Sequence, residues 1–256
     1  TEYHLTKNDG ENNLHSGLDF YHGRLWKVAD ADDTHVTFEM DSPDGDQGYP
    51  GALVMKVTYS LDEENTLMIH YEAEPDQDTI INMTNHSYFN LNGHKSGDVL
   101  NHTLWLNADA FTPADAASIP TGEIRSVEGT PMDFRTDKTI GKDIEADYEP
   151  LVFGKGYDHN WVLKNEGEFD KVAEVAGDES GIHMSVLTDL PGVQIYTANF
   201  LDGVKGRDGA VYEMRDAICL ETQYYPDAIH HENFPGPICK KGEKYDTRTA
   251  YRFRVK

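Results

Sequence analysis

The sequence predicts an all-β protein built as a large antiparallel β-sandwich. Two observations carry this prediction: strand-forming segments recur along the whole chain between turn-prone clusters, and no segment shows a long amphipathic helical period. Residues 52–59 and 66–71 are rich in β-branched and aromatic side chains, and the turn-prone residues 62–65 separate them. This pattern is typical of a β-hairpin, and many strands with hardly any helix favour a sandwich.

The remaining elements follow the same pattern. Turn-prone clusters interrupt the chain at residues 42–46 and 201–203, and residues 139–147 allow one short helix at most. Further strands are expected at residues 79–91, 102–106, 161–163, 184–187, 193–197 and 217–222. Because the chain contains no internal repeat, linker or low-complexity stretch, we predict a single domain over residues 1–256.

The charge balance restricts the partners. Acidic residues outnumber basic ones by 46 to 22, which gives a formal net charge of −24. Such a field repels nucleic acid and anionic membranes, and it disfavours a phosphorylated substrate unless a local basic pocket is present. The two cysteines, Cys219 and Cys239, are too few for a disulfide framework. With no signal-peptide or membrane-span pattern, we predict a cytoplasmic protein without nucleic-acid or membrane partners.

One histidine, His86, lies in a run of amides, hydroxyls and aromatic rings. Residues 82–91 read Asn-Met-Thr-Asn-His-Ser-Tyr-Phe-Asn-Leu. The unperturbed pKa of histidine lets it donate and accept a proton near neutrality, and neutral hydrogen-bonding groups suit a pocket for a polyhydroxylated ligand. The alternative is a buried histidine satisfied by its neighbours in a sheet.

Glu221 is the candidate for a base. In the strand expected at residues 217–222, side chains alternate between the two faces, which puts Cys219, Glu221 and Gln223 on one face. Apolar neighbours desolvate a carboxylate and raise its pKa toward the range that is useful for proton transfer. A surface glutamate in an acidic protein is the alternative that this strand alone leaves open.

Four further motifs accompany the histidine run. They are Asn-Leu-His-Ser-Gly at 13–17, Gly-Tyr-Asp-His-Asn-Trp-Val-Leu at 156–163, Pro-Gly-Val-Gln-Ile-Tyr-Thr-Ala-Asn-Phe-Leu-Asp-Gly at 191–203 and Cys-Leu-Glu-Thr-Gln-Tyr-Tyr-Pro-Asp-Ala at 219–228. In this order the five motifs span nearly the whole chain, and the sequence resembles the aldose 1-epimerase (galactose mutarotase) family. The resemblance implies the family's large twisted supersandwich, with a sugar cleft on one concave face.

The resemblance also implies an activity, the interconversion of the α and β anomers of a free aldohexose such as galactose or glucose. Opening a cyclic hemiacetal needs an acid for the ring oxygen and a base for the anomeric hydroxyl, and it requires no metal or cofactor. The family's acid and base correspond to His86 and Glu221. The expected partner is a monosaccharide, and we expect a monomer or a homodimer.

Five more residues are expected to line the sugar site. They are His15, Ser87, Tyr88, Asp158 and Gln194. The histidine, the aspartate and the glutamine match sugar-contacting residues of the family, and Ser87 and Tyr88 adjoin the proposed acid. Taken alone, His15 would be a solvated loop residue, Gln194 an ordinary strand residue and Tyr88 a core residue. His159 should point to the face opposite Asp158 and is interpreted as structural.

The sequence departs from the family near its start. Ser16 stands where the family's His-Gly-Gly motif has its first glycine. The family's strand-rich segment ahead of this motif ends in an Asn-Arg pair that has no counterpart here, since Arg24 follows His15. Because the first residue is Thr1, we expect this chain to be part of a longer polypeptide, and the sandwich formed by residues 1–256 to lack N-terminal strands of the family. A natural short variant without activity is the alternative.

Two other function classes stay open. One is a non-catalytic sugar-binding module that keeps the cleft, and the other is a glycosidase that uses Asp158 and Glu221 as its carboxylate pair. No metal site is expected, because the chain contains no metal-ligand spacing and the adjacent His230 and His231 would face apart on a strand. The acidic segments 41–46 and 143–149 are interpreted as solvated loops, with a calcium site as the alternative.

Overall fold

The computed structural model describes residues 2–255, which form two compact units. Unit 1 comprises the described residues up to 62 together with 67–82 and 237–247, and unit 2 comprises 63–66, 83–236 and the described residues from 248 onward. Strands dominate both units, and the strand pairs are antiparallel, so the predicted all-β antiparallel class is confirmed. The single domain expected over residues 1–256 stays a prediction.

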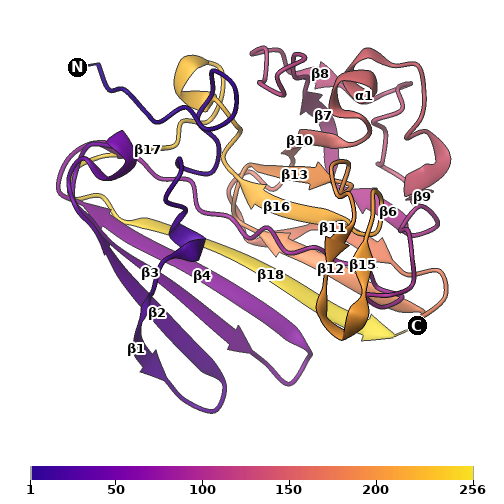
Figure 1. The fold of residues 1–256 in the computed structure, drawn as a ribbon, viewed down its shortest axis with the longest axis horizontal. Helices are drawn as coiled ribbons and strands as arrows, with labels where there is room; N and C mark the ends of the chain where they lie inside the picture. The colour runs from indigo at the N-terminus through magenta and orange to yellow at the C-terminus, as the bar shows by residue number, and fades with distance from the viewer. Residues whose placement is uncertain (1, 256) are drawn as a thin grey trace. The chain divides into compact units, whose positions relative to one another are not determined.

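Unit 1 is built on four antiparallel strands that follow chain order (Figure 1). Its elements are η1 (Tyr21–Gly23), β1 (Lys27–Ala31), β2 (His35–Ser42), η2 (Asp46–Gly48), β3 (Leu53–Leu61), β4 (Thr66–Pro75), β5 (Thr79–Ile80) and β17 (Ile238–Cys239). The predicted hairpin is confirmed as β3 and β4, paired from Leu53–Pro75 to Leu61–Leu67. Asp46 is not a solvated loop residue, because its carboxylate lies 2.5 Å from the Arg24 guanidinium and its side chain is only 13% exposed.

Unit 2 carries two sets of strands. One has the order β16-β13-β10-β7-β8, and the other has the order β18-β12-β11-β6-β9. The strands are β6 (Thr103–Leu106), β7 (Ala108–Thr112), β8 (Arg125–Ser126), β9 (Lys138–Thr139), β10 (Asp158–Leu163), β11 (Asp170–Ala176), β12 (Ile182–Thr188), β13 (Gly192–Tyr196), β14 (Val204–Lys205), β15 (Val211–Tyr212), β16 (Cys219–Gln223) and β18 (Tyr245–Val255). In Figure 1, β16 and β13 lie side by side.

The helices are few and short. They are η3 (Ile140–Lys142), α1 (Glu149–Gly154), η4 (Arg207–Gly209) and η5 (Ala228–His230), besides the two in unit 1. The short helix allowed over residues 139–147 forms only as η3, and α1 follows it with Pro150 in its first turn, where proline has no amide hydrogen to lose. No helix that the structure describes meets the length and hydrophobicity of a membrane span.

The strand expected at residues 79–91 is mostly wrong. Only β5 and an isolated bridge between Phe89 and Ile218 pair in this segment. The residues between them include Asn, Thr and Ser, whose side chains compete for backbone hydrogen bonds. One such contact is the Ser87 amide, which donates to Asn85 Oδ1 at 3.2 Å. The His86 run is therefore irregular, and it joins a strand only at Phe89.

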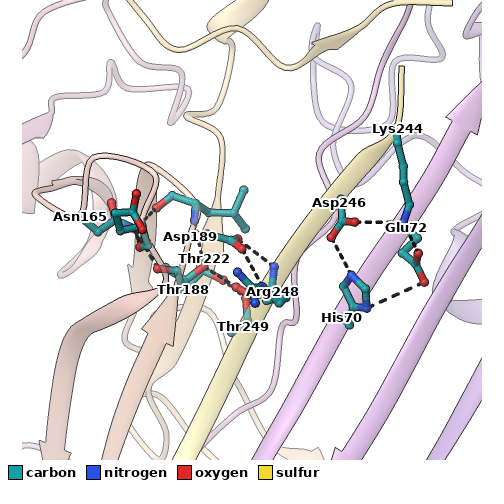
Figure 2. Close-up of polar contacts among 12 residues, drawn as sticks. His70, Glu72, Asn165, Thr188, Asp189, Thr222, Lys244, Asp246, Arg248 and Thr249 are labelled. Carbon is teal, nitrogen blue, oxygen red and sulfur yellow. Dashed lines mark hydrogen bonds and ion pairs between the residues drawn. The ribbon is translucent and has the colours of Figure 1, made fainter. Parts of the chain in front are cut away.

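The side of β16 that is opposite Glu221 packs on β18. The Tyr251 hydroxyl donates to the Leu220 carbonyl at 3.0 Å, and the Thr222 and Thr249 hydroxyls bond to each other (Figure 2). Both threonines are buried, with exposed fractions of 1%. These contacts hold β16 against the second set of strands, so they fix the strand that carries Glu221.

We expect Thr222→Val to lower the free energy of unfolding by about 1–3 kcal/mol, because the buried Thr249 hydroxyl then loses its partner. The double variant Thr222→Val/Thr249→Val should recover much of this loss, since two apolar groups of similar shape replace the pair. Urea denaturation with an unchanged m-value measures both effects. A double variant less stable than the single one would show that the hydroxyl pair is not what matters here.

Candidate active site

A row of polar side chains crosses three neighbouring strands of unit 2. In the register of β10, β13 and β16, Asn160 lies opposite Gln194, and Gln194 lies opposite Glu221. Because side chains alternate along a strand, Asp158 shares the face of Asn160, and Cys219 shares the face of Glu221. The opposite face of β10 carries Trp161, which is fully buried in the core. One face of the sheet therefore collects the groups that can do chemistry.

His86 reaches this face from outside the sheet. The backbone groups of Phe89 and Ile218 exchange two hydrogen bonds of 2.9 Å, which anchors the histidine run beside the start of β16. His86 Nε2 lies 3.5 Å from Glu221 Oε1. The imidazole stacks on Tyr88 at 5.1 Å between ring centroids and meets the edge of Tyr196 at 5.9 Å. The structure thus brings the predicted acid and the predicted base together.

Both carboxyl groups of this face titrate far from their ordinary values. Burial, and secondly the charge of Asp158, raises the pKa of Glu221 to about 8. Burial also raises the pKa of Asp158 to about 6, although the hydrogen bond from Gln194 Nε2 to Asp158 Oδ1, at 2.8 Å, opposes the shift. A buried carboxyl with a pKa near neutrality can both take up and return a proton under ordinary conditions.

A partly buried glutamate of unit 2 shows the contrast. Glu174 lines a surface hollow of about 480 Å³ with Trp105 and Lys171. Burial alone would raise the pKa of Glu174, but hydrogen bonds from Lys171, His183 and Arg254 outweigh it and lower the pKa to about 2. This carboxylate stays charged at neutral pH and cannot act as a proton carrier there. Its hollow is therefore a poor place for acid–base chemistry.

Sequence reasoning did not assign a role to several residues of the polar face. Both amide atoms of Asn160, Gln194 Oε1 and Gln223 Nε2 are buried and find no hydrogen-bond partner in the described part of the chain. Leaving such groups unsatisfied is costly, and a ligand rich in hydroxyls could bond to them. The signal was available, because Asn160, Gln223 and Cys219 each lie two residues from a predicted site residue on the same strand.

Close approach explains the glycine of the Pro-Gly-Val-Gln motif. A Cβ atom at Gly192 would lie 2.3 Å from Asn160 Oδ1 and 2.8 Å from the ring of Tyr225. Both distances are shorter than any real contact, so a larger residue would displace the Asn160 amide. The motif therefore preserves the shape of the polar face as well as supplying Gln194.

The other predicted residues differ in their placement. Ser87 is half-buried and adjoins His86 in the chain, and Tyr88 is 48% exposed, so the interpretation of Tyr88 as a core residue is wrong. His15 belongs to unit 1, where it is exposed in a turn with φ of +50°, and its role stays a prediction. His159 lies on the core face, where it is buried beside Phe111, and burial lowers its pKa to about 4.

Comparisons with known proteins agree with this geometry. The model of the family described as aldose 1-epimerase matches residues 1–252. A galactose mutarotase from Bos taurus is 43% identical over 255 residues, covering 99% of this chain and 72% of that protein. An aldose 1-epimerase from Escherichia coli is 38% identical over 252 residues, covering 97% of this chain and 72% of that protein.

Solved structures give the same result. An aldose epimerase homologue from C. elegans superposes with a TM-score of 0.89 at 31% identity, covering 99% of this chain and 75% of that one. A galactose 1-epimerase from Lactobacillus acidophilus gives a TM-score of 0.85 at 28% identity, covering 99% of this chain and 73% of that one. These matches confirm the predicted sandwich fold and the resemblance seen in the five motifs. The chain therefore belongs to the aldose 1-epimerase family.

Proposed function

We propose that this protein is a cofactor-independent isomerase that interconverts the α and β anomers of free aldohexoses such as galactose and glucose. The observation that carries the proposal is the 3.5 Å separation of His86 Nε2 and Glu221 Oε1 on a buried polar face. The relatives named galactose mutarotase and aldose 1-epimerase support the reaction and its sugar substrate. A cytoplasmic location and a monomeric or dimeric state remain predictions.

The proposed reaction needs an acid and a base at one carbon atom. His86 protonates the ring oxygen while Glu221 removes the proton of the anomeric hydroxyl, and the bond between the anomeric carbon and the ring oxygen breaks. The open aldehyde rotates about the bond to its neighbouring carbon. On reclosure, His86 takes back the proton of the attacking hydroxyl, and Glu221 returns its proton to the carbonyl oxygen. Both reacting oxygens are attached to the same carbon, so a short distance between acid and base suits the chemistry.

The remaining site residues would hold the sugar. Asp158 can accept hydrogen bonds from sugar hydroxyls, and the hydrogen bond from Gln194 fixes the orientation of its carboxyl group. The exposed ring of Tyr88 offers a surface against which a pyranose can pack. Ser87 and His15 complete the proposed set on the strength of their motifs. Sugar binding would therefore combine hydrogen bonds to the polar face with packing against the Tyr88 ring.

The test is polarimetry on freshly dissolved α-D-galactose and α-D-glucose. We expect the protein to accelerate the approach to the equilibrium rotation, and we expect heat-denatured protein to have no effect. Saturable galactose binding without acceleration would select the sugar-binding module instead. Release of monosaccharides from lactose would select the glycosidase.

The pH profile of kcat/KM tests the assignment of the base. Because the pKa of Glu221 is raised to about 8, the acid limb should lie well above the ordinary pKa of a glutamate, with activity rising as the carboxylate forms. Asp158→Asn removes a neighbouring negative charge, which makes ionisation of Glu221 easier, so the limb should move to lower pH. Asp208→Asn, which changes a surface aspartate, is the matched control and should leave the limb in place. A limb that stays put or moves upward in Asp158→Asn would contradict the assignment.

A further inference from the structure

We propose that His86, Cys219 and Glu221 together form a reversible binding site for a soft divalent cation such as Zn²⁺, and that the bound ion inhibits the enzyme. Inhibition rests on the proposed function, because the ion would occupy the atoms that transfer protons. Binding of the ion does not rest on it. The thiol of Cys219 has no part in the proton transfers described above.

The geometry brings three different donor groups together. His86 Nε2 or Nδ1, Cys219 Sγ and a carboxylate oxygen of Glu221 all lie within 4.8 Å of one another. Zn²⁺ binds imidazole nitrogen, thiolate sulfur and carboxylate oxygen at about 2.0–2.3 Å, so tetrahedral ligands lie about 3.5 Å apart. The distance of 3.5 Å from His86 Nε2 to Glu221 Oε1 fits this spacing. Small side-chain rotations can bring in the sulfur atom.

Two of the three donor residues are held in place by their strand, and the third is partly exposed to solvent. Cys219 and Glu221 stand two residues apart on one face of β16, with exposed fractions of 0% and 5%, so their strand holds them in place before any ion binds. The His86 side chain is 32% exposed, which leaves a path for an ion from solvent. Three protein ligands leave the fourth position of a tetrahedral ion free for water, as in catalytic zinc sites.

Chemistry decides which cations fit. A thiolate and an imidazole favour Zn²⁺ or Cd²⁺, whereas Mg²⁺ and Ca²⁺ prefer sites made only of oxygen. The formal charge of −24 raises the local concentration of any cation near the protein. Only the thiolate form of a cysteine binds a metal ion, so binding would release the proton of the Cys219 thiol.

Unit 1 holds a second donor cluster with similar spacing, made of His70, Glu72 and Asp246. There the ammonium group of Lys244 lies 2.6 Å from Glu72 Oε1 and 3.0 Å from Asp246 Oδ2 (Figure 2). This ammonium group already pairs with both carboxylates and would repel a second cation, and the cluster contains no thiol. We therefore assign the soft-cation site to His86, Cys219 and Glu221, and the His70 cluster becomes the control.

The first experiment measures mutarotation by the intact protein in the presence of ZnCl₂ or MgCl₂. We expect Zn²⁺ to inhibit, EDTA to restore the rate, and Mg²⁺ to have no effect. Galactose should raise the Zn²⁺ concentration needed for half-inhibition, because sugar and ion compete. Cys219→Ser should raise that concentration at least tenfold, whereas Cys239→Ser, which changes the other buried cysteine, should remain as sensitive as the wild type. Equal sensitivity of Cys219→Ser and Cys239→Ser would overturn the proposal.

The second experiment does not depend on activity. Co²⁺ added to the wild-type protein should give a thiolate-to-metal charge-transfer band, which Cys219→Ser loses and which Cys239→Ser and His70→Ala keep. In the wild type, saturating galactose should suppress the band, so the outcome does not depend on whether a cysteine variant folds. A band that galactose leaves unchanged, or no band at all, would refute the site. A protein without mutarotase activity that still shows the galactose-sensitive band would refute the proposed function and leave the metal site standing.

Discussion

Replacement of Glu221 by glutamine is expected to lower kcat for mutarotation by about 10²–10⁴-fold, the range that a positioned general base contributes, while KM changes little. The amide keeps the size of the side chain and its ability to bond to a sugar hydroxyl, but it cannot take up a proton. Because the Glu221 side chain is only 7% exposed, water has little access to replace it as the base. Polarimetric kinetics on α-D-galactose measure both constants.

Glu174→Gln is the matched control for this variant. It also removes a partly buried carboxylate of unit 2, but one that is occupied by Lys171, His183 and Arg254. Its kcat should remain that of the wild type even if its stability falls. A Glu221→Gln protein that retains full kcat would remove Glu221 from the mechanism, whatever its effect on sugar binding.

Glu221→Gln should also change how the free energy of unfolding depends on pH. The folded protein holds a proton on Glu221 up to a pKa of about 8, whereas an unfolded glutamate releases it near pH 4.3. Between these values the folded state binds more protons, so the contribution of Glu221 to stability declines as pH rises through this window. Glu221→Gln should lack that decline. Urea denaturation at pH 5 and pH 8.5 would show a smaller difference in the variant than in the wild type.

The sequence predicted a part of the strands, those whose signal is local, and it did not predict others such as β1, β2, β7, β11 and β18. The hairpin of β3 and β4 and the strands β10, β13 and β16 follow from β-branched and aromatic residues bounded by turns. The strand predicted around His86 did not form, because the residues have strand propensity while the Asn85 side chain accepts a hydrogen bond from the Ser87 backbone amide. The alternation of side chains therefore identified the two faces of the paired strands. It could not show that residues 82–91 pair with a strand only through Phe89.

The sequence predicted which residues form the site, but it could not predict how they are arranged in space. The motifs identify Glu221 and Asp158, and the alternation of side chains along the strand places Cys219 on the same face as Glu221. The register that puts Asn160, Gln194 and Glu221 in one row depends on which strands pair, and the order β16-β13-β10 cannot be read from a single sequence. The approach of His86 to Glu221 likewise depends on a bridge between distant segments. Long-range pairing carries no local signal.

The second large effect is expected for His86→Asn, which should lower kcat by about 10²–10⁴-fold. Asparagine can still donate a hydrogen bond but cannot transfer a proton to the ring oxygen. His94→Asn, which changes a partly exposed histidine of the same unit paired with Asp208, is the matched control and should keep the wild-type kcat.

Added imidazole separates proton transfer from positioning in this variant. If His86 acts only by holding Tyr88 and Tyr196 in place through its ring contacts, free imidazole cannot restore the rate. If it supplies the proton, imidazole should enter the space left by the shorter side chain and restore part of kcat, with a pH dependence that follows the pKa of the added base. Rescue that is absent in His86→Asn, while galactose still binds, would make His86 a positioning residue and leave the ring oxygen without its proposed acid.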